Sequence, residues 1–143
     1  MKTIWSKQKE IQAAAYYLRY QVFVIEQGIS PNAEFDAYDT SETIYGVGFI
    51  DNMPVATIRY QQISTTTLQP DRFCVLAAYR KQGFGKQLLL ALEELAKENH
   101  CQEAILSAET SALNFYQKLG YHVISEVFLE DGIACMKMQK KLG

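Results

Sequence analysis

The sequence predicts an α/β fold, an α+β mixed sheet with helices packed on its faces. Segments with the apolar spacing of helices alternate with β-branched and aromatic segments that are typical of strands. Two turn signals, Asp51-Asn52 and Asp131-Gly132, each separate a pair of strand-like segments, as in hairpins. Such interleaving is characteristic of a layered sheet covered by helices. The 143 residues fit a single domain, 1–143, large enough to bury its own core.

The first half of the chain is expected to run from a strand and a helix through a loop into three strands. Gln8–Tyr20 contains the helix formers Ala and Leu, and Ser6 is a candidate cap for this helix. Gly28 and Pro31 favour a loop. The expected elements are Lys2–Ser6, Gln8–Tyr20 with an extension over Gln21–Gln27, the loop Gly28–Ser41, and the strands Glu42–Ile50, Pro54–Ile63 and Leu68–Leu76.

The second half carries the strongest helical pattern, Gly83–Glu98, which Asn99 is expected to end. Glu93 and Lys97 are spaced as an ion pair on its polar face. A second helix is expected to start at Thr110 or Ser111 and to end at Gly120. The apolar face of the first helix consists of Phe84, Leu88, Ala91, Leu92 and Leu95, and that of the second consists of Ala112, Phe115, Tyr116 and Leu119. The remaining expected strands are Glu103–Ser107, Tyr121–Leu129 and Ile133–Lys140.

Composition excludes several classes of protein. The formal net charge of −2 and the absence of a basic cluster argue against a nucleic-acid partner. Three separated cysteines without a CxxC pair predict neither a disulfide framework nor a metal site. The N-terminus lacks the apolar core of a signal peptide, and no run of 18 apolar residues could span a membrane. We therefore expect a cytoplasmic protein.

The segment Phe73–Lys86 predicts a strand end, a tight turn and a helix start. Gly83 and Gly85 allow a sharp turn and a close approach of the backbone to a ligand. The first amides of a helix have no partner within it, and with the helix dipole they form a phosphate site. The segment matches neither a Walker A loop nor the GxGxxG fingerprint, because Ser or Thr does not follow Lys86 and Leu88 replaces a glycine.

Arg80-x-x-Gly83-x-Gly85 resembles the acetyl-CoA signature of the GNAT superfamily of N-acetyltransferases. Ala112–Tyr121 resembles the second motif of that family, A-x-x-F-Y-x-x-x-G-F/Y. Arg19–Gln27 resembles R-x-x-V-F-V-x-E-Q of its small bacterial YjcF/ElaA-like subgroup, and Glu130–Ile133 matches the closing E-D-G-I hairpin. The resemblance covers nearly the whole chain in the family's order. Three positions depart from it: Ala77 replaces a proline, Glu109 an amide and Cys135 a histidine.

The resemblance implies a GNAT-like, mostly antiparallel twisted sheet that is splayed between two central strands. It implies acetyl-CoA as co-substrate, no metal, and an amine of a small molecule or peptide as acceptor. The pantetheine arm would follow the strand end, an N–H near Val75 or Leu76 would hold the oxyanion, and a homodimer is conceivable. The implied cofactor-binding residues are Cys74, Val75, Leu76, Arg80, Lys81, Gln82, Gly83, Phe84, Gly85, Lys86 and Tyr116.

Two residues are candidates for catalysis. Tyr116 matches the tyrosine that would protonate the leaving thiolate, and the alternative is a tyrosine of the core. Glu34 is the candidate base, in a loop with Asp36 and Asp39 that would attract a cationic acceptor; the alternative is a solvated acidic loop. Glu26 is a further candidate base. An acetyl-enzyme on Cys74 is disfavoured because no histidine partner is evident.

Two other functions stay open at this point. The chain could be a non-catalytic acyl-CoA-binding sensor or regulatory module, which would need the glycine turn but not Tyr116. It could also be an interaction domain that uses the same turn without CoA.

Overall fold

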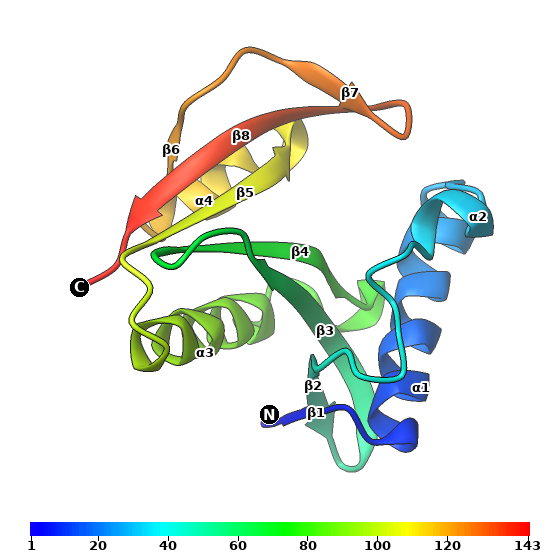
Figure 1. Cartoon of the computed structure of the whole chain (residues 1–143). Coiled ribbons are helices and arrows are strands. Elements are labelled where there is room, and N and C mark those ends of the chain that lie inside the picture. Colours follow the sequence, from blue (N-terminus) through cyan, green and yellow to red (C-terminus); the bar gives the residue numbers. More distant parts are fainter. The chain divides into compact units, whose positions relative to one another are not determined.

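The computed structural model describes every residue from Met1 to Gly143, in two compact units (Figure 1). The first unit comprises residues 1–59 and 72–92, and the second comprises 60–71 and 93–143. In chain order the elements are β1 (Lys2–Ser6), α1 (Lys9–Arg19), the π-helical segment η1 (Tyr20–Glu26), α2 (Pro31–Glu34), β2 (Tyr45–Ile50), β3 (Met53–Gln62), β4 (Thr67–Val75), the 3₁₀ turn η2 (Ala77–Tyr79), α3 (Phe84–Glu98), β5 (Glu103–Glu109), the 3₁₀ turn η3 (Thr110–Ala112), α4 (Leu113–Lys118), β6 (His122–Val123), β7 (Phe128–Glu130) and β8 (Ile133–Lys141).

The first unit is built on antiparallel strands in the order β1–β2–β3, followed by β4. Asp51 and Asn52 join β2 to β3 with φ values of 48° and 65°, which gives the predicted hairpin turn. α1 packs on this sheet through an apolar face that continues into η1. The buried side chains of this core are Ile11, Ala15, Leu18 and Val22 from the helices and Tyr45, Val47 and Cys74 from the strands.

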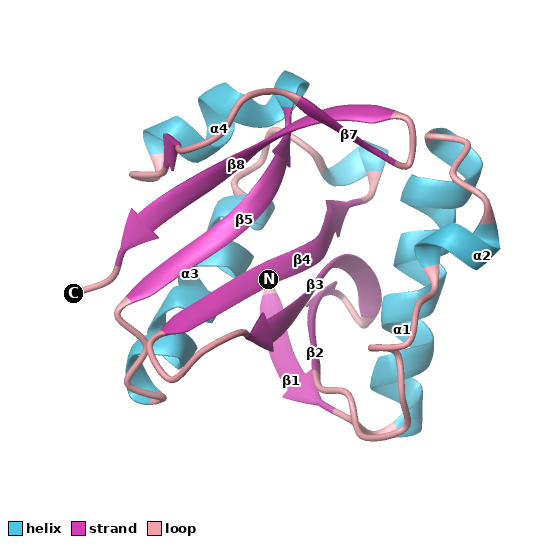
Figure 2. Cartoon of the chain, turned by 45° about the horizontal axis from the view of Figure 1, so that its top comes forward, coloured by secondary structure: helices cyan, strands magenta, loops and turns pink.

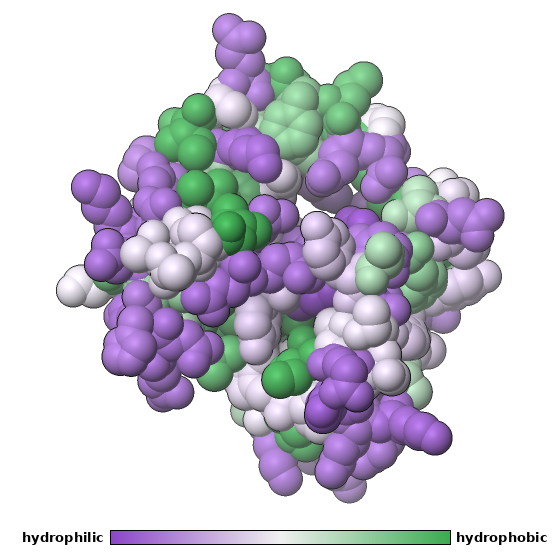
Figure 3. Space-filling model, in the orientation of Figure 1, coloured by the Kyte–Doolittle hydropathy of each residue, from purple (hydrophilic) through white to green (hydrophobic).

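The second unit is organised around β8, which pairs with β5 from Glu103↔Lys141 to Glu109↔Cys135 and also with β6 and β7 (Figure 2). Here β4 and β5 form a parallel ladder over Thr67↔Glu103 and Leu68↔Ala104. The sheet pairing is therefore mostly antiparallel, as predicted. Figure 3 shows apolar side chains over β7 and the segment before it, where Ile124, Val127 and Leu129 are exposed.

The α/β class and the order of the main elements are confirmed, and the differences lie at element ends. η1 continues α1 as a π-helix, and the loop Gly28–Ser41 contains the short α2. The expected strand Tyr121–Leu129 is divided into β6 and β7. None of the helices is both long enough and apolar enough to span a membrane.

The expected helix caps are partly wrong. Ser6 accepts a hydrogen bond from the Gln8 amide, but Gln8 is the N-cap of α1 and makes no side-chain cap. α4 starts after Ala112 without a side-chain cap, so neither Thr110 nor Ser111 has that role. α3 ends at Glu98, directly before Asn99 as predicted, and the left-handed residue after it is His100, with φ of 63°. Gly120 ends α4 as predicted, with φ of 97°.

The predicted ion pair between Glu93 and Lys97 is wrong. Lys97 contacts Glu94 instead, at 3.1 Å. Glu93 is buried, where it accepts hydrogen bonds from the Tyr121 hydroxyl at 2.9 Å and from Lys140 Nζ at 2.7 Å. The buried Glu93 carboxylate is stable there because two hydrogen-bond donors of the same unit, Tyr121 and Lys140, satisfy it.

Candidate functional site

The turn between β4 and α3 reverses the chain through residues with positive φ. The η2 turn closes with a bond from the Tyr79 amide to Leu76 O at 2.9 Å. Lys81 then has φ of 63° and Gly83 φ of 86°, and α3 starts at Phe84. The Gln87 amide donates to Gly83 O at 3.0 Å, which fixes the first helical turn. The local structure follows from a glycine at the position that a side chain would strain.

This turn exposes a row of main-chain N–H groups. None of the amides from Gln82 to Lys86 donates a hydrogen bond within the chain. A Cβ atom placed on Gly83 would meet no atom within 4 Å, so the approach to these amides is open. The amides stand at the N-terminus of a helix of 15 residues, where the helix dipole favours an anion. The exposed Lys81 and Lys86 add positive charge. The bend is thus open and its donors unused, as the phosphate-site prediction requires.

Arg80, the first residue of the signature, is committed to protein partners. Its Nη1 and Nη2 donate to the two carboxylate oxygens of Glu26 at 2.6 and 2.7 Å. Its Nε donates to Val75 O at 2.9 Å. The guanidinium lowers the pKa of the Glu26 carboxyl, so Glu26 is a weaker proton acceptor than an ordinary glutamate.

The end of β4 narrows the choice of oxyanion donor. The Leu76 amide donates to Val55 O of β3 at 2.9 Å and is already used. Because donors alternate in direction along a strand, the Val75 amide points away from β3. Val75 therefore becomes the candidate donor. Cys74 is buried, and burial raises the pKa of its thiol far above the usual range, which leaves no thiolate for an acetyl-enzyme.

Glu34 belongs to a buried ion-pair network of the first unit rather than to a solvated loop. Its side chain is 1% exposed, and its Oε2 accepts from Arg19 Nε at 2.9 Å. Arg19 also donates to Asp39 at 2.7 and 2.8 Å and lies over the Phe35 ring at 4.8 Å. The sequence left the role of Arg19 open between shaping the acceptor site and pairing with a carboxylate, and the structure shows the pairing.

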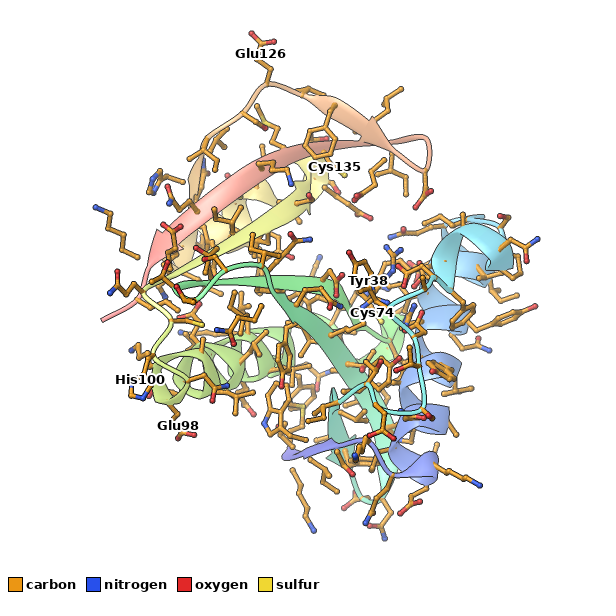
Figure 4. The ribbon with its side chains drawn as sticks, viewed as in Figure 1. Tyr38, Cys74, Glu98, His100, Glu126 and Cys135 are labelled. Carbon is orange, nitrogen blue, oxygen red and sulfur yellow. The ribbon has the colours of Figure 1, made fainter.

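Two further arginines complete this network. Arg59 donates to Asp36 at 2.7 and 3.0 Å and to Asp39 at 3.0 Å. Arg72 donates to Asp36 at 3.1 Å, and its Nε lies 3.5 Å from Glu34 Oε2. The ring of Tyr38, which is labelled in Figure 4, stacks on the Arg59 guanidinium, with Cζ 5.6 Å from the ring centroid. The three carboxylates of the loop thus face three guanidinium groups, and the predicted acidic attraction of a cationic acceptor is not supported.

Glu34 keeps one feature of a proton acceptor. Its Oε1 is buried and has no hydrogen-bond partner. Burial raises the pKa of its carboxyl, although Arg72 and Arg19 act in the opposite direction. Arg72, beside it, adopts a positive φ of 46°, a strained conformation for a non-glycine residue. The role of Glu34 as a base stays a prediction.

Tyr116 lies on α4 in the second unit. It is 9% exposed, and its ring packs edge-on against Phe115 and Tyr121 at 5.1 and 5.8 Å. Burial raises the pKa of its phenol above the usual range, and Glu109 and Cys135 add to the shift. The ring therefore belongs to the core, and its hydroxyl remains protonated at any physiological pH. Whether that hydroxyl serves as the general acid stays a prediction.

Sequence reasoning missed Arg59 and Arg72 as partners of the acidic loop. One signal was present: Arg59 directly follows the mostly apolar strand segment Val55–Ile58, and a charge buried in such a strand needs a partner. Arg72 carried no such signal, because its neighbours in the sequence do not show that it lies beside Glu34 and Asp36. The pairing of Glu26 with Arg80 joins positions 54 residues apart and could not be read from the sequence.

Comparisons with known proteins identify the family of this chain. The family described as acetyltransferase (GNAT) domain matches residues 24–142. The N-acetyltransferase YjcF of Bacillus subtilis, of uncharacterised activity, is 35% identical over 141 residues, 98% of this chain and 99% of that protein. The crystal structure of a Lactobacillus plantarum protein that is described as an N-acetyltransferase has a TM-score of 0.94 at 37% identity. The match covers 99% of this chain and 98% of that one. Escherichia coli ElaA has a TM-score of 0.83 at 26% identity and covers 97% of this chain and 99% of that one. Because the family match spans most of the sequence and includes both the turn before α3 and α4, this chain belongs to the GNAT family of acetyltransferases.

Proposed function

We propose that this protein is an acetyl-CoA-dependent N-acetyltransferase that transfers the acetyl group directly to an amine of a small molecule or peptide. The observation that carries the proposal is the row of unused amides at Gln82–Lys86, open to solvent at a helix N-terminus. Family membership supplies the reaction class. Three free cysteines in a chain without disulfides suit a reducing, cytoplasmic location.

The donor would bind along the strand end and the turn. The diphosphate of CoA would accept hydrogen bonds from the amides of Gln82–Lys86, and the pantetheine arm would follow Cys74–Leu76. The Val75 amide would donate to the thioester carbonyl and stabilise the negative charge that develops on its oxygen. Main-chain donors suit this task because the fold fixes them before the ligand arrives.

The acceptor must lose a proton before it reacts. An alkyl ammonium group has a pKa near 10.4, so its proton must pass to a base, directly or through a water. Glu34 is the stronger candidate, because its pKa is raised and one oxygen lacks a partner, whereas Arg80 lowers the pKa of Glu26. The neutral amine would then attack the carbonyl carbon, and the C–S bond would break. The thiolate would take a proton from the Tyr116 hydroxyl, and the second proton that the amine nitrogen loses on becoming an amide would return to the Tyr116 oxygen.

A two-step assay tests the proposal. Thermal unfolding is measured with and without millimolar CoA, and free thiol release from acetyl-CoA is then followed across a panel of amines. We expect CoA to raise the melting temperature, since a ligand that binds only the folded state stabilises it. Turnover on at least one amine would support the enzyme. Stabilisation without turnover on any amine would favour the acyl-CoA-binding sensor, and no stabilisation would exclude both.

A further inference from the structure

The two motifs of the chain meet in one ion pair. Glu26 is the glutamate of the segment Arg19–Gln27 and ends η1, whereas Arg80 begins the signature Arg80–Gly85. The Arg80 fork holds both carboxylate oxygens of Glu26, at 2.6 and 2.7 Å. Such bidentate pairing fixes orientation as well as distance, which a single contact cannot do.

Arg80 is also anchored on its other side. Its Nε donates to Val75 O at the end of β4, at 2.9 Å. The planar guanidinium therefore has one edge on β4 and the other on η1. η1 itself is π-helical, a form that is rare and occurs mostly as short insertions at functional sites. A contact that ties its last residue to β4 limits the positions that this segment can adopt.

The same two elements form the walls of an open pocket of about 370 Å³. Gln21, Val22 and Glu26 contribute the η1 wall, and Leu76 and Ala77 contribute the wall that follows β4. Glu26 itself lines the pocket, and Arg80 links it to Val75, the residue directly before Leu76 in the opposite wall. Leu76 is also one of the residues along which the pantetheine arm is proposed to lie.

We propose that Glu26 and Arg80 are positioning residues that set the separation of the two pocket walls, and that Arg80 acts on the donor through this geometry rather than as a ligand of its diphosphate. The proposal rests on the proposed function, because the donor is CoA. It assigns the diphosphate to the main-chain amides and the exposed lysines, and it gives the subgroup glutamate a role on the donor side.

The alternative, in which Arg80 binds the diphosphate directly, predicts the opposite change in CoA affinity for one mutation. If Arg80 bound the diphosphate, Glu26 would compete for the same guanidinium, and Glu26→Gln would tighten CoA binding. If the pair positions the walls, Glu26→Gln loosens them and weakens binding. Pantetheine, which lacks the diphosphate, distinguishes the two arrangements further. If the pair positions the walls, Glu26→Gln should weaken pantetheine binding as much as CoA binding. If Arg80 binds the diphosphate, Glu26→Gln should leave the affinity for pantetheine unchanged.

The experiment titrates CoA by calorimetry and pantetheine by NMR into the wild type, Glu26→Gln and the charge reversal E26R/R80E. Glu42→Gln is the matched control, because Glu42 forms an exposed pair with Lys7 outside the pocket. We expect Glu26→Gln to weaken CoA and pantetheine alike, by about two- to fivefold for a half-exposed pair. The charge reversal should recover part of this loss, and Glu42→Gln should change neither ligand.

Hydrogen exchange of the free protein gives a readout that does not depend on CoA. Glu26→Gln should speed amide exchange in Tyr20–Glu26, and Glu42→Gln should not. Tighter CoA binding by Glu26→Gln, an effect on CoA but not on pantetheine, or unchanged exchange in η1 would each overturn the proposal. Failure of the wild type to bind CoA would instead refute the proposed function, while faster exchange in η1 would still show that the pair holds this segment.

Discussion

The two terminal nitrogens of Arg19 donate hydrogen bonds to the two carboxylate oxygens of Asp39, at 2.7 and 2.8 Å, and the Arg19 side chain has no exposed surface. Asp39 also accepts from the Tyr45 hydroxyl at 2.6 Å. Burial opposes ionisation of Asp39, but the hydrogen bonds from Arg19 and Tyr45 outweigh it and hold the pKa of its carboxyl far below the usual range. The pair thus fastens the loop after α2 to the last residue of α1.

Replacing Asp39 by Asn should destabilise the protein strongly. Removing one charge leaves Arg19 buried with less compensation, and breaking a buried pair costs about 3 kcal/mol. Urea unfolding should show a loss of that size in the free energy of unfolding. Glu42→Gln, which breaks an exposed pair, should change it by less than about 1 kcal/mol. Equal effects of the two changes would mean that the buried network does not stabilise the fold.

Replacing Gly83 by Ala should impair CoA binding more than stability. Ala at φ of 86° costs about 1 kcal/mol, and its methyl group would enter the open space over the amides. Loss of hydrogen bonds to a charged diphosphate should weaken CoA about ten- to hundredfold. Gly132→Ala is the matched control, since Gly132 has φ of 79° and an equally open Cβ position in the β7–β8 hairpin. Calorimetric titration compares the two, and similar affinities would count against the turn as the diphosphate site.

Tyr116→Phe should lower kcat by about a hundredfold and leave the KM for acetyl-CoA nearly unchanged, because a lost general acid slows the chemical step. The raised pKa of this phenol also predicts no alkaline loss of activity from Tyr116 in the range where ordinary tyrosines ionise. Tyr121→Phe is the control, because it removes a buried hydroxyl group that donates a hydrogen bond to Glu93. It should reduce stability rather than kcat. Steady-state kinetics with an amine that the enzyme acetylates tests this prediction. A Tyr116→Phe enzyme with the wild-type kcat would mean that Tyr116 has only a structural role in the core.

Replacing Glu34 by Gln tests the proposed base through the pH profile. A base works only when deprotonated, so activity should fall as pH drops through the Glu34 pKa, which burial places above that of an ordinary glutamate. Glu34→Gln should lower kcat/KM by about a hundredfold and remove that acidic limb. Glu42→Gln should keep both the rate and the limb. If a folded Glu34→Gln enzyme kept the wild-type rate, Glu34 would have only a structural role.

The sequence allowed the fold to be predicted where a local signal was strong. The apolar spacing of α3, the positive-φ turn at Asp51-Asn52 and the glycine turn at Gly83 all correspond to the observed elements, because each follows from short-range sterics. Helix caps were harder, since α1 and α4 start without any side-chain cap.

Charge partners were beyond the reach of sequence patterns. Glu34, Asp36 and Asp39 could be identified as an acidic group, but their neutralisation by Arg19, Arg59 and Arg72 depends on tertiary packing. Glu93 was placed on a polar face because its spacing to Lys97 was suitable, yet partners from β8 and Tyr121 bury it. A motif therefore predicted the local conformation of the backbone better than the partners of the charged side chains.

The most direct measurement is an NMR titration of ¹⁵N-labelled protein with CoA that follows the amide resonances of Gln82–Lys86. The account predicts large, saturable shifts of these resonances, since their N–H groups would pass from solvent to the diphosphate. Binding of CoA that leaves them unchanged, or no binding at all, would contradict it.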